Sequence, residues 1–134
     1  MSSAPHKEMN TKRTFPGKIL AAIRDDKMLR IRAGTGPHRF IGIWPVVVEG
    51  RVFVRSWNLK PRSWYRTFLE EPQGAILVDG REIAVRAVRT RSERLKDAID
   101  EAYLEKYDTR GSIQYARDLG RAKSKATTTE LVPL

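Results

Sequence analysis

Two strand-like runs that meet at Glu49-Gly50 constrain the fold more than any other part of the chain. The runs are Phe40–Val48 and Arg51–Trp57, and both are rich in β-branched and aromatic residues. A pair that contains glycine between two such runs is a strong signal for a β-hairpin with a two-residue turn. The turn predicts that Val48 lies opposite Arg51, and that the pairing continues outward from there.

Both faces of this hairpin are apolar, although a sheet covered on one side only would have a polar outer face. The pairing puts Val47 opposite Val52 and Val46 opposite Phe53. One face then carries Ile43, Val47, Val52 and Val54. The other face carries Trp44, Val46, Phe53 and Trp57, with Arg55 among them. We expect the first face to line a barrel interior and the second to lie under a helix or a partner chain. The second face is therefore the reason to expect a homodimer.

The rest of the chain alternates between helical and strand patterns. Helices are predicted from Thr14 to about Asp26, over Ser63–Glu71 before Pro72, from the cap Ser92 onward, and over Ser112–Leu119. Further strands are predicted at Met28–Ala33, Ala75–Val78, Arg81–Arg89 and Thr127–Val132, with a turn at Asp79-Gly80. About six mostly antiparallel strands with helices at the breaks predict an α+β fold, a small barrel with peripheral helices. Residues 1–13 have no apolar period and are expected to be a flexible N-terminal tail before a domain at 14–134.

The composition excludes several classes of function. The 134 residues suffice for one domain with a substantial core, and there is no cysteine, which excludes disulfides, thiolate catalysis and cysteine metal sites. Two histidines are too few for a zinc site, so no metal is expected. The longest apolar run is interrupted by Gly42 and Pro45 and falls far short of a membrane span. We expect a cytoplasmic protein that does not enter a membrane.

The charge points to a phosphate-bearing partner. The net charge is +10, from 26 basic and 16 acidic residues, and such a balance attracts nucleic acid, lipid headgroups or a phosphorylated cofactor. Residues 55–66 carry no acid, and their basic residues are Arg55, Lys60, Arg62 and Arg66. Residues 117–125 contain Arg117, Arg121, Lys123 and Lys125 against Asp118 alone.

Several short segments resemble the split-barrel flavin-binding superfamily, which includes pyridoxamine-phosphate oxidase and the deazaflavin-dependent nitroreductases. They are VFVRSW at the end of the first hairpin, SWYRTFLEEP in the short helix, ILVDGREIAVRAV in the second hairpin and the terminal TTTELVP. The chain is similar in particular to a small uncharacterised bacterial family within that superfamily, over roughly residues 15–134. The resemblance implies a six-stranded, mostly antiparallel split β-barrel that binds FMN or a deazaflavin at a homodimer interface and acts as an oxidoreductase.

The same resemblance implies which residues hold the cofactor. The phosphate would contact the basic and hydroxyl residues His38, Arg39, Arg55, Ser56, Lys60, Arg62 and Ser63. Trp57 and Trp64 would stack on the isoalloxazine ring. A hydroxyl at a helix start and an arginine beside it suit an anion. No catalytic side chain is implied, because the cofactor itself supplies the redox chemistry.

Two other functions remain open from the sequence alone. Tryptophans beside arginines in a basic chain are also typical of a nucleic-acid-binding module. A cofactor-free structural barrel is the third possibility, because Trp57-Asn58 look inserted in the loop and Trp64 stands where a lysine is usual. In that reading the basic residues form a solvated surface, the tryptophans pack, and His38 is a turn residue.

Overall fold

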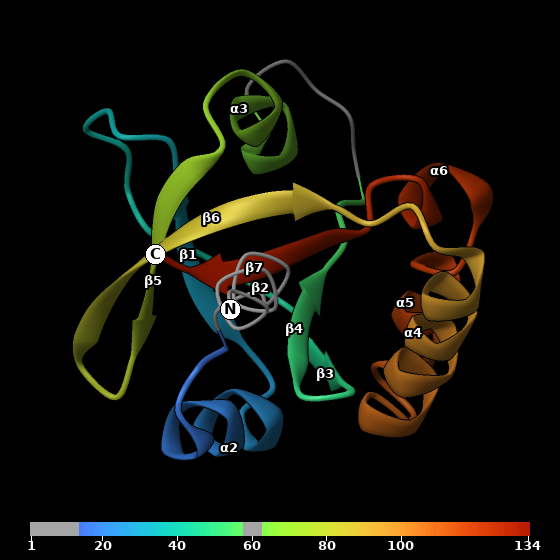
Figure 1. Cartoon of the computed structure of the whole chain (residues 1–134). Coiled ribbons are helices and arrows are strands. Elements are labelled where there is room, and N and C mark those ends of the chain that lie inside the picture. Colours follow the sequence, from blue (N-terminus) through green and yellow to red (C-terminus); the bar gives the residue numbers. More distant parts are fainter. Residues whose placement is uncertain (1–13, 58–62) are drawn as a thin grey trace, which may run out of the picture.

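The strands form one curled antiparallel sheet in a computed structural model that describes residues 14–57 and 63–134 (Figure 1). The strands are β1 Leu29–Ala33, β2 Ile41–Ile43, β3 Val46–Val48, β4 Arg51–Val54, β5 Gln73–Val78, β6 Arg81–Arg89 and β7 Thr129–Pro133. Their order in the sheet is β2-β1-β5-β6-β7-β4-β3. The prediction of an α+β fold with an antiparallel, barrel-like sheet and peripheral helices is confirmed. The expected tail, residues 1–13, lies outside the described residues.

The prediction of six strands was wrong, because the run Phe40–Val48 is two strands and not one. Trp44-Pro45 ends β2 and precedes β3, so the described part of the chain contains seven strands. Proline has no backbone N–H to donate to a neighbouring strand and breaks a ladder where it stands. The β-rich composition on both sides of Pro45 concealed this break.

The same break curls the sheet. β2 and β3 are the two edge strands of the sheet, yet only two residues join them. Three peptide units separate Ile43 from Val46, so the two edges come within about 11 Å of each other at this corner. The sheet therefore forms a half-barrel around its own inner face.

Both predicted hairpins have the expected register. Val46 pairs with Phe53, Val47 with Val52 and Val48 with Arg51. The turn residues Glu49 and Gly50 have φ angles of 55° and 72°, which match the turn type that suits the twist of a two-residue hairpin. In the second hairpin Val78 pairs with Arg81 around a turn of the same kind.

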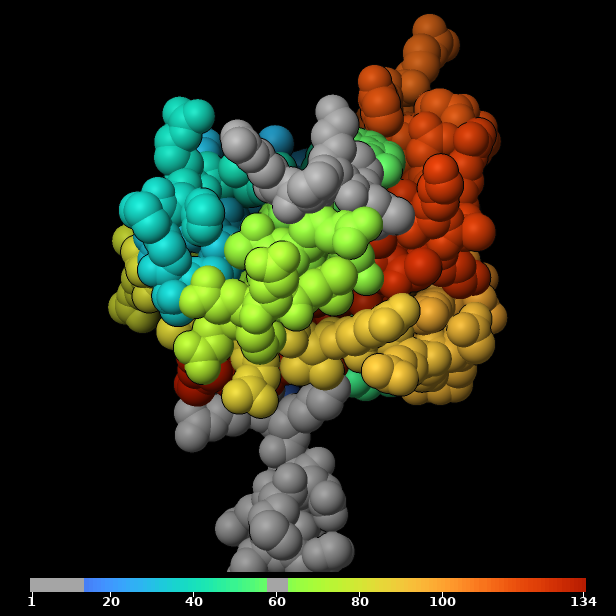
Figure 2. Space-filling model, turned by 90° about the horizontal axis from the view of Figure 1, so that it is seen from above, coloured from blue at the N-terminus to red at the C-terminus, as the bar shows by residue number. Residues whose placement is uncertain are grey.

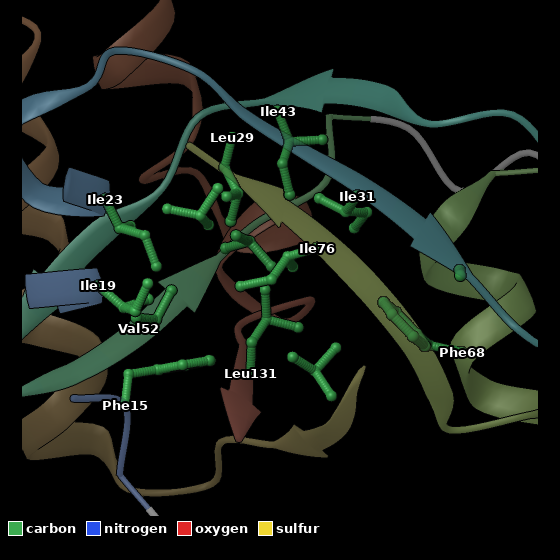
Figure 3. Packing of buried hydrophobic residues seen from close by; sticks show 14 residues of the cluster. Phe15, Ile19, Ile23, Leu29, Ile31, Ile43, Val52, Phe68, Ile76 and Leu131 are labelled. Carbon is green, nitrogen blue, oxygen red and sulfur yellow. The ribbon is translucent and has the colours of Figure 1, made fainter. Parts of the chain in front are cut away.

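The inner face of the half-barrel holds an aliphatic core closed at its two ends by helices (Figures 1 and 3). Helix α2, Gly17–Asp25, contributes Ile19 and Ile23, and helix α3, Trp64–Glu70, contributes Phe68 from the opposite end. The strands supply fully buried side chains such as Ile76. We call this cluster the inner core. The helix predicted from Thr14 begins at Gly17, with Pro16 at its N-cap position.

A second cluster, the outer core, lies between the outer face of the first hairpin and helix α4, Glu93–Lys106. It contains Val46 and Phe53 from the hairpin, and it extends to α5, Ile113–Asp118. Helix α6, Ala122–Lys125, follows and was not predicted. Of the two covers expected for the second apolar face, a helix or a partner chain, the structure shows the helix. Because α4 covers it, this face no longer argues for a homodimer.

Within residues 14–57 and 63–134, no helix combines the length and the apolar character that crossing a membrane would require.

Candidate functional site

A pocket of about 570 Å³ opens between α3 and the β1–β2 edge of the sheet. Its lining residues are Ile31, Ala33, His38, Arg39, Ile41, Trp64 and Thr67. In Figure 2 the turn that leads into β2, in turquoise, lies beside α3, in light green. Three of the residues implied by the flavin-protein resemblance, His38, Arg39 and Trp64, therefore come together here.

The floor of the pocket is apolar because β1 alternates. Ile31 and Ala33 point toward the inner core and are 0% and 6% exposed. Arg30 and Arg32, which alternate with them along the strand, face outward. Ile41 on β2 forms part of the wall and is 43% exposed. An exposed aliphatic side chain on a pocket wall is surface that a bound ligand would cover.

Helix α3 supplies the opposite wall through Trp64 and Thr67, which are three residues apart and so share a helix face. The Ser63 hydroxyl caps the helix by accepting the Arg66 N–H at 3.3 Å. The indole of Trp64 meets the ring of Phe68 edge-on, with 6.1 Å between centroids. Packing against the inner core therefore fixes the position of the indole.

The cationic side of the pocket comes from the turn between β1 and β2. His38 and Arg39 are both exposed there. The Thr35 hydroxyl donates a hydrogen bond to the Glu71 carboxylate, which follows α3. This bond and the Thr35 backbone hold the pKa of Glu71 below its usual value, and the charge of His38 adds to the effect. The ionised Glu71 thus connects the turn that carries His38 and Arg39 to the helix that carries Trp64.

Arg55 lies elsewhere and has a structural role. Its side chain is fully buried, and its guanidinium connects β4 to the outer core and to β7. It donates to the Thr128 hydroxyl at 2.9 Å, the Asp100 carboxylate at 2.5 Å, and the Leu119 and Lys96 carbonyl oxygens at 3.0 Å each. With these partners in place, this guanidinium does not face the pocket.

The remaining residues implied by the resemblance are distributed as follows. Ser56 is buried, and its N–H donates to the Thr127 hydroxyl at 2.8 Å. Trp57 is 50% exposed and contacts Trp44 and Tyr115. Ser63 caps α3 but does not line the pocket. Lys60 and Arg62 lie outside the described residues. The structure therefore separates Ser56 and Trp57, like Arg55, from the residues of the pocket.

The sequence reasoning missed Thr67, Ile41 and Glu71. Helical spacing from Trp64 could have found Thr67. No sequence signal pairs Glu71 with Thr35, because they are 36 residues apart. Among the side chains described, no cluster of three or more His, Cys, Asp or Glu residues could hold a metal ion.

Comparison with known proteins assigns a family. A family model described as "Uncharacterized protein conserved in bacteria (DUF2255)" matches residues 19–131. A search of curated proteins finds no match.

Proposed function

The chain belongs to this bacterial family of uncharacterised proteins, and from the geometry of the pocket we propose that it is a flavin-binding split-barrel protein. FMN is the first candidate ligand and a phosphorylated deazaflavin the second. The observation that carries the proposal is the meeting of Arg39 and His38 with an indole and an apolar floor in one pocket. A flat, largely apolar ring system with a phosphate tail matches this combination.

The lining residues fit the two halves of such a ligand. Arg39 can make a charge-assisted, bidentate contact to a phosphate, and His38 adds a second donor. Trp64 and the exposed wall residue Ile41 offer an aromatic and an aliphatic surface to the ring. The volume of about 570 Å³ lies within the range of ligand pockets. Arg55 and Ser56 are left out of the proposed site, because their polar groups serve the fold.

A bound flavin would supply the redox chemistry, with hydride or electron transfer to a small acceptor. The protein would bind and orient the cofactor and keep positive charge near its phosphate. One chain supplies all the described lining residues, so the proposal applies to a monomer as well as to the expected homodimer.

Absorbance spectra of the purified full chain, with and without added FMN, test the proposal first. The dissociation constants of FMN and riboflavin, from quenching of flavin fluorescence, then test the phosphate contact. The wild type should bind FMN more tightly than riboflavin. Replacement Arg39→Ala should weaken FMN binding by about ten- to a hundredfold, as expected for the loss of one charge-assisted hydrogen bond, and should leave riboflavin binding nearly unchanged.

The matched control is Arg86→Ala, which removes an exposed arginine on β6 that does not line the pocket. Trp64→Ala should weaken the binding of both FMN and riboflavin, since it removes the surface proposed to contact the ring system that they share. If FMN fails to bind, the flavin proposal is wrong and a cofactor-free barrel is the better description; if FMN binds but Arg39→Ala and Arg86→Ala behave alike, the cofactor does not occupy this pocket.

A further inference from the structure

Three aromatic side chains outside the pocket meet in a partly exposed cluster that we call the aromatic ledge: Trp44, Trp57 and Tyr115. Their rings are in edge-to-face contact, with centroid separations of 5.6 Å, 5.3 Å and 6.2 Å. Trp57 and Tyr115 are 50% and 51% exposed. The three residues come from the β2–β3 corner, the end of β4 and α5, so the fold brings together rings that are far apart in the sequence.

The outer core supports the ledge from below. Trp44 stacks on the buried ring of Tyr107, with centroids 4.2 Å apart and planes 4° from parallel. The Tyr107 hydroxyl lies 2.8 Å from the Pro45 carbonyl oxygen and 3.0 Å from that of Lys27. Because the supporting ring is held at both its face and its hydroxyl, the ledge is formed before any ligand arrives.

Two neighbouring half-exposed aromatic rings are unusual on a free protein surface and indicate an interaction site. The ledge is not the pocket wall, since none of its three residues lines the pocket. It therefore needs an occupant of its own.

The charge of the segment that carries Tyr115 indicates which occupant. Residues 110–125, which include Tyr115, contain five basic residues and a single acidic one, Asp118. Four of the basic side chains are exposed: Arg110, Arg117, Arg121 and Lys123. Asp118 is engaged by Arg121 and by Gln114. The Lys27 ammonium lies 5.3 Å from the centre of the Tyr107 ring, on which Trp44 stacks.

We propose that the aromatic ledge binds single-stranded nucleic acid, with unpaired bases stacked on Trp57 and Tyr115 and phosphates held by the exposed cations of α5 and α6. Exposed rings on a rigid support and exposed cations on the same segment of the chain are the two components of a stacking site for single strands. A duplex fits less well, because its bases are already stacked on one another. This inference does not depend on the flavin proposal.

Fluorescence anisotropy of the full chain with a fluorescein-labelled 15-nucleotide oligouridine tests the proposal. Binding should weaken steeply as salt increases from 50 to 200 mM, because phosphate contacts release counterions. Trp57→Ala and Tyr115→Ala should each weaken binding by about five- to a hundredfold, the loss expected for one stacked base. Trp57→Phe should retain most of the affinity, and an unlabelled duplex should compete less well than unlabelled oligouridine.

Trp64→Ala is the matched control, because it removes an indole from the pocket and none from the ledge. It should leave oligouridine binding unchanged, and thermal melts should show that each variant is folded. Arg117→Gln should reduce the slope of log affinity against log salt by about 0.7 if Arg117 contacts a phosphate.

Three results would overturn the proposal. The first is no binding of oligouridine at 50 mM salt. The second is binding that Trp57→Ala and Tyr115→Ala leave intact, since the strand would then lie on another surface. The third is a dimer in sedimentation that Trp57→Ala dissociates, since a second copy of the chain would then occupy the ledge.

Discussion

The two hydrophobic cores of this protein are held together in different ways. The inner core consists of aliphatic side chains and two phenylalanines, with no polar group among its buried members. The outer core contains Tyr103 and Tyr107, and buried Arg55 lies against it with its guanidinium 5.7 Å from the Tyr103 ring. The Tyr103 hydroxyl donates to the Trp44 carbonyl oxygen at 2.7 Å.

This difference reflects two requirements of the fold, which are to close the half-barrel and to hold helices α4–α6 against its outside. Burial alone closes the half-barrel, because its curled sheet already satisfies the backbone. Directed hydrogen bonds place α4–α6, because short helices lying on the outside of a sheet could slide along an apolar surface. The pocket borders the inner core, and the aromatic ledge packs on the outer core through Trp44 and Tyr107.

The largest effect should come from removing the hydrogen-bonding centre of the outer core. Arg55→Ala removes one of the two cations paired with the Asp100 carboxylate, which keeps Lys125, and leaves three further acceptors without their donor. Each buried acceptor left without a donor costs about 1–3 kcal/mol, so urea unfolding should show a loss of at least about 3 kcal/mol in the free energy of unfolding. Arg94→Ala is the control, because its ion pair with Glu49 is exposed on both sides. Equal losses in the two variants would show that Arg55 does not organise the outer core.

The inner core should respond to volume alone. Ile76 is fully buried, and Ile76→Ala should cost about 2–5 kcal/mol of the free energy of unfolding, against about 0.5–1.5 kcal/mol for Ile76→Val. Leu69→Ala, at a side chain that is 54% exposed, should change stability little. If Ile76→Val destabilised the protein as much as Ile76→Ala, the inner core would depend on something other than the amount of apolar surface buried.

The sequence predicts the features that depend on near neighbours. The turns at Glu49-Gly50 and Asp79-Gly80 set the register of both hairpins, and the caps Ser63 and Ser92 set two helix starts. The Pro45 break was missed, because local β propensity is high on both sides of it. That two residues join the two edge strands, β2 and β3, can be recognised only once the order of all the strands in the sheet is known.

The candidate site shows the same limit. His38, Arg39 and Trp64 were named from the sequence, and they line one pocket. Arg55 was grouped with them because residues 55–66 contain no acid. Its acidic partner, Asp100, is 45 residues away on α4, so a local count of charges could not detect it.

A smaller effect should follow from the loss of one buried hydroxyl in the outer core. Tyr107→Phe removes the hydrogen-bonding group near the Pro45 and Lys27 carbonyl oxygens while keeping the ring under Trp44. The Pro45 carbonyl oxygen keeps the Lys106 ammonium as a donor, so the loss should be the roughly 0.5–1.5 kcal/mol of one hydrogen bond, which urea unfolding can resolve. Tyr115→Phe changes an exposed ring and should leave stability unchanged. A Tyr107→Phe variant as stable as the wild type would mean that water replaces the hydroxyl there.

The smallest effect should be a pH dependence at the junction of the two cores. The Lys106 ammonium donates to the Ile23 carbonyl oxygen at 3.1 Å and to the Pro45 carbonyl oxygen at 2.9 Å, and so connects α4 with α2 and the β2–β3 corner. Burial lowers the pKa of Lys106 from 10.5 to about 8, and the charge of Lys27 adds to this while Asp26 and Asp25 oppose it. A neutral amine keeps two hydrogens for the two carbonyls, so deprotonation loses neither hydrogen bond.

Below pH 8, Lys106 is protonated in both the folded and the unfolded states, and its contribution to stability does not change with pH. Between about pH 8 and 10.5 the unfolded chain binds more protons at this site, so the free energy of unfolding should rise with pH. Lys106 is only half-buried, so solvent screening should keep the rise near or below about 1 kcal/mol.

Burial raises the pKa of Tyr103 and Tyr107, so above about pH 10 only the unfolded tyrosines ionise and stability should fall again. Urea unfolding between pH 7 and 11 should therefore show a maximum near pH 10. Lys106→Met should remove the rise and keep the fall, whereas Lys123→Met, at an exposed lysine on α6, should keep both. If the free energy of unfolding of Lys106→Met still rose with pH, another group would be responsible for the rise.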